Sequence, residues 1–447
     1  MSNNTTYAEI SSVLRQAMDL HRRGQIEAAE RGYRAIAGLP GTPPEAGSLL
    51  GMLLTEQGKL AEALAILEAT LSLFPQSTLC RTALGQAYLQ SGKWRLAAEE
   101  IAAVLRTEPE NADLHRNLGT ACKNLGDVQG AVLAYRRSLS LRRAYDGRHP
   151  AVLTDHATNG VKLEHDLAQI RMLIERYPIR QDLAEMESAL STELSANPLY
   201  KQAPFRMVPI DTESARRIGW FYNRLIHEPI VAVPDQVLSR PEELTAKSEE
   251  ICAGFPLIIV DDFLNPEALM GLRQLCEEST FWFEPKDHGG HVGTYLDEGF
   301  DHPLIVAIAR ETRAAMPHLL ADTILKQAWA YKYDNRGAGT RIHADQADFT
   351  LNLWITDDSC NRDGGGGLII TDVSAPPEWN FHQYNASAST IDEHLDSRNA
   401  KRRRIEHKAN RAVFFRSNYF HATESFHFGE GYVDRRINVS LMYGGVR

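Results

Sequence analysis

A histidine and an aspartate stand two residues apart at His343 and Asp345, directly before a segment that alternates like a β-strand. His421 follows another apolar segment 76 residues after Asp345, and Arg436 opens the last apolar segment 15 residues after His421. Two imidazoles and one carboxylate can occupy one face of an octahedral Fe(II) ion and leave three positions open. A bidentate 2-oxo acid and dioxygen fill those positions. The residue types therefore predict an iron site.

A 2-oxo acid needs a second anchor, because its distal carboxylate must be held while its keto acid end binds the metal. Arginine suits this role, since its guanidinium forks onto a carboxylate and stays charged. Strand alternation places Arg436, Asn438 and Ser440 on one side, which would face a polar pocket. Arg435 is the alternative anchor, but the shared parity with Asn438 and Ser440 favours Arg436.

The C-terminal pattern resembles the Fe(II)/2-oxoglutarate-dependent dioxygenases of the double-stranded β-helix fold, the class that includes prolyl hydroxylases. The resemblance covers about residues 255–447 and is carried by "HAD", by a distal histidine after "VFF" and by the terminal "RIN". The segment "DGGGGLII" looks like the glycine-rich strand between the two ligand-bearing segments of these enzymes. Tyr333, ten residues before His343, looks like the tyrosine that usually precedes the first ligand in these enzymes.

What the resemblance implies is an enzyme that uses Fe(II), 2-oxoglutarate as cosubstrate and O2. Halogenases of this fold have a small residue in place of the carboxylate, so Asp345 implies hydroxylation or a related oxidation. Asn438 stands where many members have serine, and Asn352 lies on the strand after Asp345, which is expected to line the same pocket. The predicted catalytic and metal residues are His343, Asp345 and His421, and the predicted cosubstrate residues are Arg436, Asn438, Tyr333 and Asn352.

Other histidines and another metal are alternatives to this site. His382, His394 and His407 lie in a loop-like insert, and His427 is six residues past His421. None of them directly follows an apolar strand as His421 does, so we expect them at the surface or on the substrate side. Zinc fits the same three ligands, but the arginine would then lack a purpose.

The first third of the chain repeats with a period of 34 residues, and Pro75 and Pro109 close two of the units. The pattern is similar to the tetratricopeptide repeat over residues 10–143. The resemblance implies antiparallel helix pairs that stack into an α-solenoid, with a groove for a protein or peptide partner. A purely structural or dimerising array is the alternative. Three series recur in register: Gly51, Gly85 and Gly119; Gly58, Gly92 and Gly126; and Ala63, Ala97 and Ala131.

Between the repeats and the C-terminal module, Gly147 and Pro150 break the period. An amphipathic helix is expected over residues 160–178 and another helix over residues 179–194. His165 and Asp166 are expected there as solvent-facing or packing polar groups.

The module begins with a buried strand over residues 256–260, followed by a helix from Asn265 and another over residues 302–320. Short strands follow, which indicates an antiparallel sandwich or barrel. The predicted fold is multidomain α + β, with repeats over 1–143, a helical or irregular connector over 144–250 and a double-stranded β-helix (jelly roll) with supporting helices over 251–447.

A long insert over about residues 374–410 is expected to form a lid or substrate wall. Trp379 and Tyr384 are candidates for substrate contact there, with packing of the lid as the alternative. The basic run "KRRR" at residues 401–404 is interpreted as a solvated loop, with contact to an anion or an acidic substrate as the alternative.

Charge and composition exclude several classes of protein. The net charge is −10, which disfavours nucleic acid as a partner. No apolar run reaches the roughly 18 residues of a membrane span, and the N-terminus lacks the features of a signal peptide. A cytoplasmic location is therefore expected. The five cysteines are scattered singly, which argues against disulfides or a cysteine zinc site.

The leading hypothesis is a hydroxylase that oxidises a C–H bond of a protein or peptide recruited by the repeats. One alternative is an oxygenase acting on a small molecule or a carrier-bound metabolite. Another is a non-enzymatic repeat scaffold with a degenerate barrel. The sequence does not specify the oligomeric state.

Overall fold

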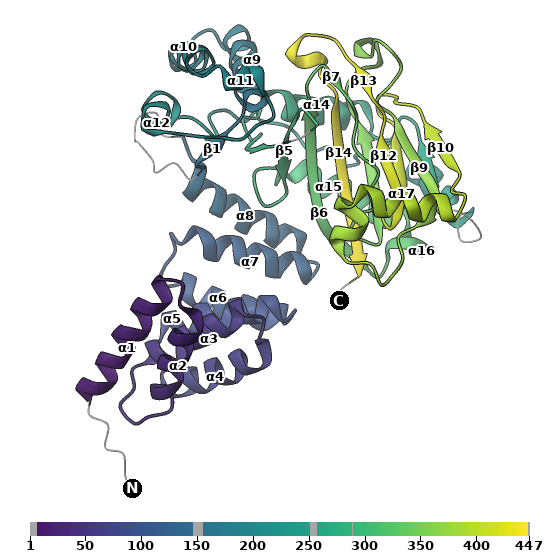
Figure 1. The fold of residues 1–447 in the computed structure, drawn as a ribbon. Helices are drawn as coiled ribbons and strands as arrows, with labels where there is room; N and C mark the ends of the chain where they lie inside the picture. The colour runs from purple at the N-terminus through teal and green to yellow at the C-terminus, as the bar shows by residue number, and fades with distance from the viewer. Residues whose placement is uncertain (1–6, 146–154, 251–256, 288, 446–447) are drawn as a thin grey trace. The chain divides into compact units, whose positions relative to one another are not determined.

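The structure is a computed structural model and describes residues 7–145, 155–250, 257–287 and 289–445. The chain forms two compact units, residues 1–141 and residues 142–446 (Figure 1). Gly147 and Pro150, which were expected to break the repeat period, lie outside the described residues, as does Cys252. Within the described ranges, no helix is both long and apolar enough to cross a membrane.

The repeat unit consists of helices that pair in antiparallel fashion. Gly58, Gly92 and Gly126 join the two helices of successive pairs, and each has a positive φ of 75°, 70° or 82°. Glycine adopts this conformation without a steric penalty, which is why the turn glycine recurs. The helices are α1 (Tyr7–Arg22), α2 (Ile26–Ile36), α3 (Pro44–Glu56), α4 (Leu60–Leu73), α5 (Thr78–Gln90), α6 (Trp94–Leu105), α7 (Ala112–Asn124) and α8 (Val128–Arg143).

The other glycine series lies where the paired helices touch. A Cβ atom added to Gly51 would lie 2.3 Å from Leu67, and one added to Gly85 would lie 2.9 Å from Ile101. Leu67 and Ile101 are both fully buried, so any larger residue in place of either glycine would push the helices apart. The expected helical solenoid is therefore confirmed.

Helices also open the second unit. The two helices expected after the repeats are present as α9 and α10. Asn265 caps α14 by accepting a hydrogen bond from the backbone N–H of Ala268. The single helix expected over residues 302–320 is two helices, because Pro317 begins a new turn. The helices are α9 (Gly160–Arg176), α10 (Gln181–Ala196), α11 (Leu199–Gln202), α12 (Thr212–Ile218), α13 (Pro241–Glu250), α14 (Pro266–Glu278), α15 (Pro303–Ala315) and α16 (Pro317–Leu320).

His165 in α9 is buried, so it does not face solvent. It is a packing residue, because its ring lies 5.8 Å from that of Trp282 and 5.4 Å from that of Tyr432. Its Nδ1 atom lies 3.1 Å from an oxygen of Asp166.

The strands form two main antiparallel sheets. A seven-stranded sheet has the order β3-β11-β8-β14-β6-β5-β4, and a three-stranded sheet has the order β10-β9-β12. Two-stranded pairs, β1 with β2 and β13 with β7, complete the pairing. The strands are β1 (Ala157–Thr158), β2 (Val208–Pro209), β3 (Leu257–Val260), β4 (Glu284–Pro285), β5 (His291–Tyr295), β6 (Thr323–Tyr333), β7 (Arg336–Gly337), β8 (Phe349–Trp354), β9 (Leu368–Ser374), β10 (Arg402–Ile405), β11 (Ala412–Arg416), β12 (Tyr419–Thr423), β13 (Phe426–His427) and β14 (Ile437–Gly445).

A hydrophobic core joins the two main sheets. β8 and β11 contribute Trp354, Val413 and Phe415 to it, while β9 and β10 contribute Leu368, Ile370 and Ile405. Two antiparallel sheets that share inward-facing apolar residues form a sandwich. The expected helices followed by antiparallel strands are thus present, whereas closure into a jelly roll stays a prediction.

The insert over 374–410 contains regular structure. It comprises a π-helical turn η3 (His382–Ala386), the helix α17 (Ala388–Ser397) and the edge strand β10. The interpretation of "KRRR" as a solvated loop is wrong, because Arg402 to Arg404 pair with β9. The segment forms a strand because this conformation buries Ile405 in the core while the side chains of its neighbours stay exposed.

Candidate metal centre

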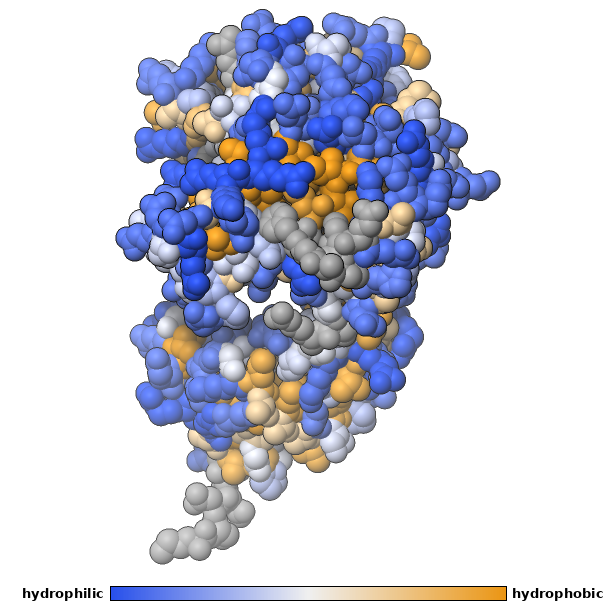
Figure 2. Space-filling view, turned by 90° about the vertical axis from the view of Figure 1, so that its right-hand side faces the viewer, coloured by the Kyte–Doolittle hydropathy of each residue, from blue (hydrophilic) through white to orange (hydrophobic). Residues whose placement is uncertain are grey.

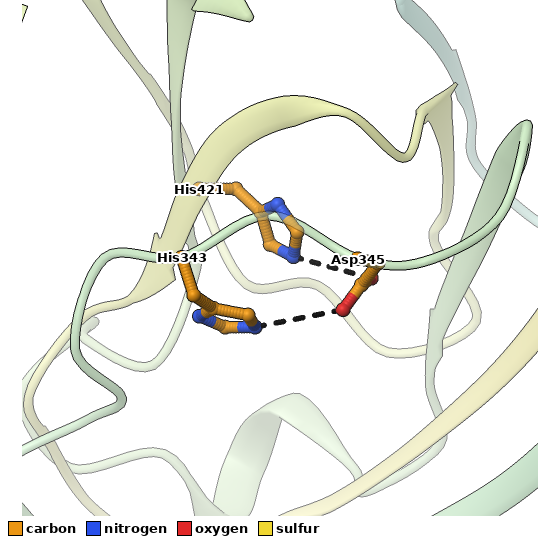
Figure 3. A group of neighbouring side chains, drawn as sticks. All are labelled: His343, Asp345 and His421. Atoms are coloured by element: carbon orange, nitrogen blue, oxygen red, sulfur yellow. Dashed lines mark ion pairs between the residues drawn. The ribbon is translucent and has the colours of Figure 1, made fainter. Parts of the chain in front are cut away.

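Three predicted ligands converge at one point of the second unit. His343 and Asp345 lie in the loop before β8, and His421 lies in β12. One ligand atom from each residue can be chosen so that all three lie within 4.8 Å of one another. The Nε2 atoms of His343 and His421 lie 3.7 and 3.4 Å from the two oxygens of Asp345. Figure 3 shows both imidazoles and the carboxylate pointing toward one another.

Backbone hydrogen bonds hold these ligands in place. The N–H of His343 donates to the carbonyl of His421 at 2.9 Å, and the N–H of His421 donates back at 2.8 Å. The N–H of Asp345 donates to the carbonyl of Ser417 at 2.8 Å. The loop that carries two ligands is therefore pinned to the segment that carries the third.

The imidazoles are oriented by their other nitrogen atoms. Nδ1 of His343 lies 2.8 Å from the carbonyl oxygen of Arg341, and Nδ1 of His421 lies 2.9 Å from that of Tyr419. A carbonyl can only accept, so the Nδ1 atoms carry protons and the Nε2 atoms are directed at the site. This is the usual outer arrangement of histidine ligands.

Charge in the site favours metal binding. Burial, aided by the neighbouring His421, lowers the pKa of His343, which keeps its imidazole neutral. Burial alone would raise the pKa of Asp345, but the attraction of His421 outweighs it and lowers that pKa. Burial also opposes protonation of His421, yet the carboxylate of Asp345 raises its pKa overall. The site thus holds an ionised carboxylate that attracts a cation.

Arg436 is a buried cation with an unused donor. Its side chain is 1% exposed, and Nε donates to the carbonyl of Gly366 at 3.0 Å. Within the described part of the chain, Nη1 has no hydrogen-bond partner. The guanidinium lies 4.8 Å from the ring centre of Tyr333. A buried guanidinium with a free N–H is suited to an anion, because an unpaired buried charge is costly.

The alternative anchor points elsewhere. Arg435 lies 3.8 Å from a carboxylate oxygen of Asp334, and its guanidinium lies 5.9 Å from the ring centre of Tyr432. Adjacent residues of an extended segment project to opposite sides, so the side chains of Arg435 and Arg436 point in different directions.

The other predicted cosubstrate residues form a polar row across β8 and β14. Asn438 donates to the hydroxyl of Ser440 at 3.0 Å, and that hydroxyl donates to the side-chain oxygen of Asn352 at 2.6 Å. Ser440 and Asn352 are direct cross-strand partners. All three side chains are buried, so this row is a polar strip inside the sandwich.

His407 was expected at the surface or on the substrate side, and it does not lie at the surface. Its side chain is buried, with its ring 5.3 Å from that of Trp354 and 5.1 Å from that of Phe428. Neither ring nitrogen has a hydrogen-bond partner among the described residues. Burial and then the charge of Arg436 lower the pKa of His407 to about 3. Ile405 and His407 are buried on either side of the exposed Glu406, so the burial of His407 continues the alternation of β10 beyond its last residue.

The remaining histidines lie nearer the surface. His382 is exposed, and His394 and His427 are half-buried. None of the three belongs to the metal-binding group found among the described residues.

The insert lies against the loop between His343 and Asp345. The N–H of Ala344 donates to the carbonyl of Tyr384 at 2.9 Å, and the side-chain amide of Asn385 donates to the carbonyl of Ala344 at 3.3 Å. Burial, and then the charge of Asp345, raise the pKa of the Tyr384 hydroxyl. Trp379 instead packs 6.2 Å from the ring of Phe420, as expected for packing of the lid.

Comparison with known proteins identifies the repeats. The tetratricopeptide repeat family matches residues 14–78 and 82–148. The N-terminal part therefore consists of tetratricopeptide repeats, which generally mediate contacts between proteins. No curated protein matches the chain.

Solved structures of repeat proteins are similar to part of this chain. MamA of Desulfovibrio magneticus RS-1 is 19% identical, with 43% of this chain and 95% of that chain covered and a TM-score of 0.28. A thermophilic tetratricopeptide-repeat protein of Thermus thermophilus is 19% identical, with 41% and 99% covered and a TM-score of 0.28. Similarity at that level carries no argument about function.

Proposed function

We propose that the second unit is an Fe(II)- and 2-oxoglutarate-dependent dioxygenase that hydroxylates a C–H bond of a protein or peptide recruited by the repeats. The observation that carries the proposal is the convergence of His343, Asp345 and His421, three residues of the right chemical types.

The donor set fits Fe(II). Two neutral imidazoles and one carboxylate form the facial set that non-haem iron enzymes use. His343 and His421 keep their Nε2 atoms directed at the site because their Nδ1 atoms are bonded to the backbone. Asp345 supplies the negative charge, and Thr350 donates a hydrogen bond of 3.1 Å to it, which fixes its orientation. When bound, iron and 2-oxoglutarate supply the oxidation of a C–H bond by dioxygen.

The surroundings of Arg436 fit the distal carboxylate of 2-oxoglutarate. The free Nη1 would donate to a carboxylate oxygen, while the bond to Gly366 holds the guanidinium in position. Tyr333 covers one side of the guanidinium and excludes water from the pair.

Strand order also supports this proposal. From β8 onward the chain crosses repeatedly between the two main sheets: β8 belongs to the large sheet, β9 and β10 to the small one, β11 to the large one, β12 to the small one and, after β13 in a separate pair, β14 to the large one. Such alternation between two antiparallel sheets is typical of a jelly roll. It would bring ligands from β12 and from the loop before β8 to the same end of the sandwich.

The test is release of succinate from 2-oxoglutarate by the full-length protein with Fe(II) and O2. We expect turnover in the wild type and its loss in His343→Ala, together with loss of iron binding measured by calorimetry. His318→Ala is a matched control, because its side chain is exposed and pairs with the exposed Glu249. Absence of both turnover and iron binding in the wild type would refute the proposal.

A further inference from the structure

The small sheet ends in a strongly basic edge strand. Lys401 precedes β10, and the first three residues of β10 are Arg402, Arg403 and Arg404. All four side chains are exposed. Figure 2 looks onto the side of the molecule where β10 lies and shows hydrophilic side chains beside a hydrophobic area on that face.

Strand register places one of these arginines on the face of the metal site. Arg403 pairs with Ile370 of β9, and Ile370 pairs with His421 of β12. Directly paired residues project to the same side of a sheet. Arg403 therefore projects to the same side as the ligand His421, two strand spacings away, or about 10 Å between backbones.

The buried neighbour confirms this parity. Ile405, two residues after Arg403, points into the core between the sheets. Arg403 shares the direction of Ile405 but stays exposed, so it lies on the inner face at the open edge of the sandwich.

Arg404 projects to the opposite face and is already engaged. Its guanidinium donates to Glu424 at 2.5 Å, to Glu406 at 3.1 Å and to the carbonyl of Gly364 at 2.9 Å. Within the described ranges, the side chain of Arg403 has no hydrogen bond or ion pair. One arginine of the run is thus structural, whereas Arg403 is available to a ligand.

The outer edge of β10 suits an extended chain. The N–H of Asp372 donates to the carbonyl of Lys401. The backbone groups of residues 401 and 403 are therefore directed at the neighbouring strand β9. Because inward and outward groups alternate along an antiparallel edge, the backbone groups of Arg402 and Arg404 face outward. An extended peptide can pair with such an edge.

We propose that Arg403 binds a carboxylate side chain of an acidic, extended protein segment, and so selects acidic sequence next to the oxidised residue. The proposal rests on the proposed function and adds a substrate class to it. The protein as a whole has a net charge of −10, so an unpaired cation at the metal-site face is a local attraction for an acidic chain.

Peptide binding tests the inference directly. The full-length protein, with Fe(II) and 2-oxoglutarate but without dioxygen, is titrated into fluorescein-labelled peptides in which serine alternates with aspartate, asparagine or lysine. Anisotropy reports binding. We expect the aspartate peptide to bind tightest and Arg403→Glu to weaken it roughly tenfold, the usual scale for a directly paired charge.

Arg402→Glu is the matched control, because it makes the same change of charge one residue away on the outer face. Equal weakening by the two variants would overturn the role of Arg403, as would equal binding of the three peptides to the wild type. The comparison remains valid in metal-free protein, so a failure of succinate release would refute the dioxygenase without being mistaken for a failure of Arg403.

Discussion

His343 and His421 exchange both of their backbone hydrogen bonds, although 78 positions separate them in the chain. This isolated bridge aligns the two imidazoles, whose ring centres lie 4.5 Å apart. A pairing of this kind orders the two predicted ligands in the metal-free protein, so we expect little conformational entropy to be lost when a metal binds.

Arg436→Lys should raise the KM for 2-oxoglutarate by roughly ten- to a hundredfold. Lysine keeps the positive charge but cannot form the two parallel hydrogen bonds that a guanidinium makes to a carboxylate. Succinate release measured at several concentrations of 2-oxoglutarate checks this. Arg435→Lys serves as the control, since Arg435 faces Asp334. The assignment of the anchor would be wrong if the two variants were affected equally.

Asp345→Asn should lower the pKa of His421 in the metal-free protein. The carboxylate of Asp345 is what raises that pKa against the effect of burial, and asparagine carries no charge. Nuclear magnetic resonance of the imidazole nitrogens across a pH titration measures it. Iron affinity should fall in the same variant, and an unchanged His421 titration would contradict the described pairing.

His407 should make the second unit sensitive to acid. Its folded pKa of about 3 lies below the unfolded value of about 6.5, so below pH 6.5 the unfolded chain takes up a proton that the folded chain excludes. Stability is therefore lost as the pH falls from about 6.5 toward 3, with a loss of about 2 kcal/mol between pH 7 and pH 5.

Chemical denaturation of the wild type and of His407→Phe at pH 7 and pH 5 checks this contribution. The variant should lose less stability on acidification, because phenylalanine does not titrate. The same pH dependence in both proteins would show that His407 is protonated in the folded state.

Removal of residues 1–141 should separate recruitment from chemistry, since this segment is a compact unit of its own. We expect the shortened protein to release succinate slowly without substrate, and to lose oxidation of proteins in a cell lysate, followed as a mass gain of one oxygen. Full oxidation of lysate proteins by the shortened protein would show that the repeats do not recruit the substrate, and would favour recruitment by the second unit.

Periodicity made the elements predictable. The 34-residue spacing of Gly58, Gly92 and Gly126 required a turn with positive φ at each position, and the alternation around Asn438 and Ser440 required a strand with one polar side. These are local consequences of backbone geometry, so they can be read along the chain. The expected single helix over 302–320 did not take account of Pro317, a local signal at which a new helix begins.

The sequence by itself predicted the residue types of the candidate site, the repeats and most strands, because residue types and regular spacings can be taken directly from the chain. Tertiary structure decided the burial of His407 and the inward direction of Arg403. Both depend on how β10 pairs with β9, and β9 with β12. Cross-strand register joins residues far apart in sequence, and a shift of one residue would have turned Arg403 away from His421.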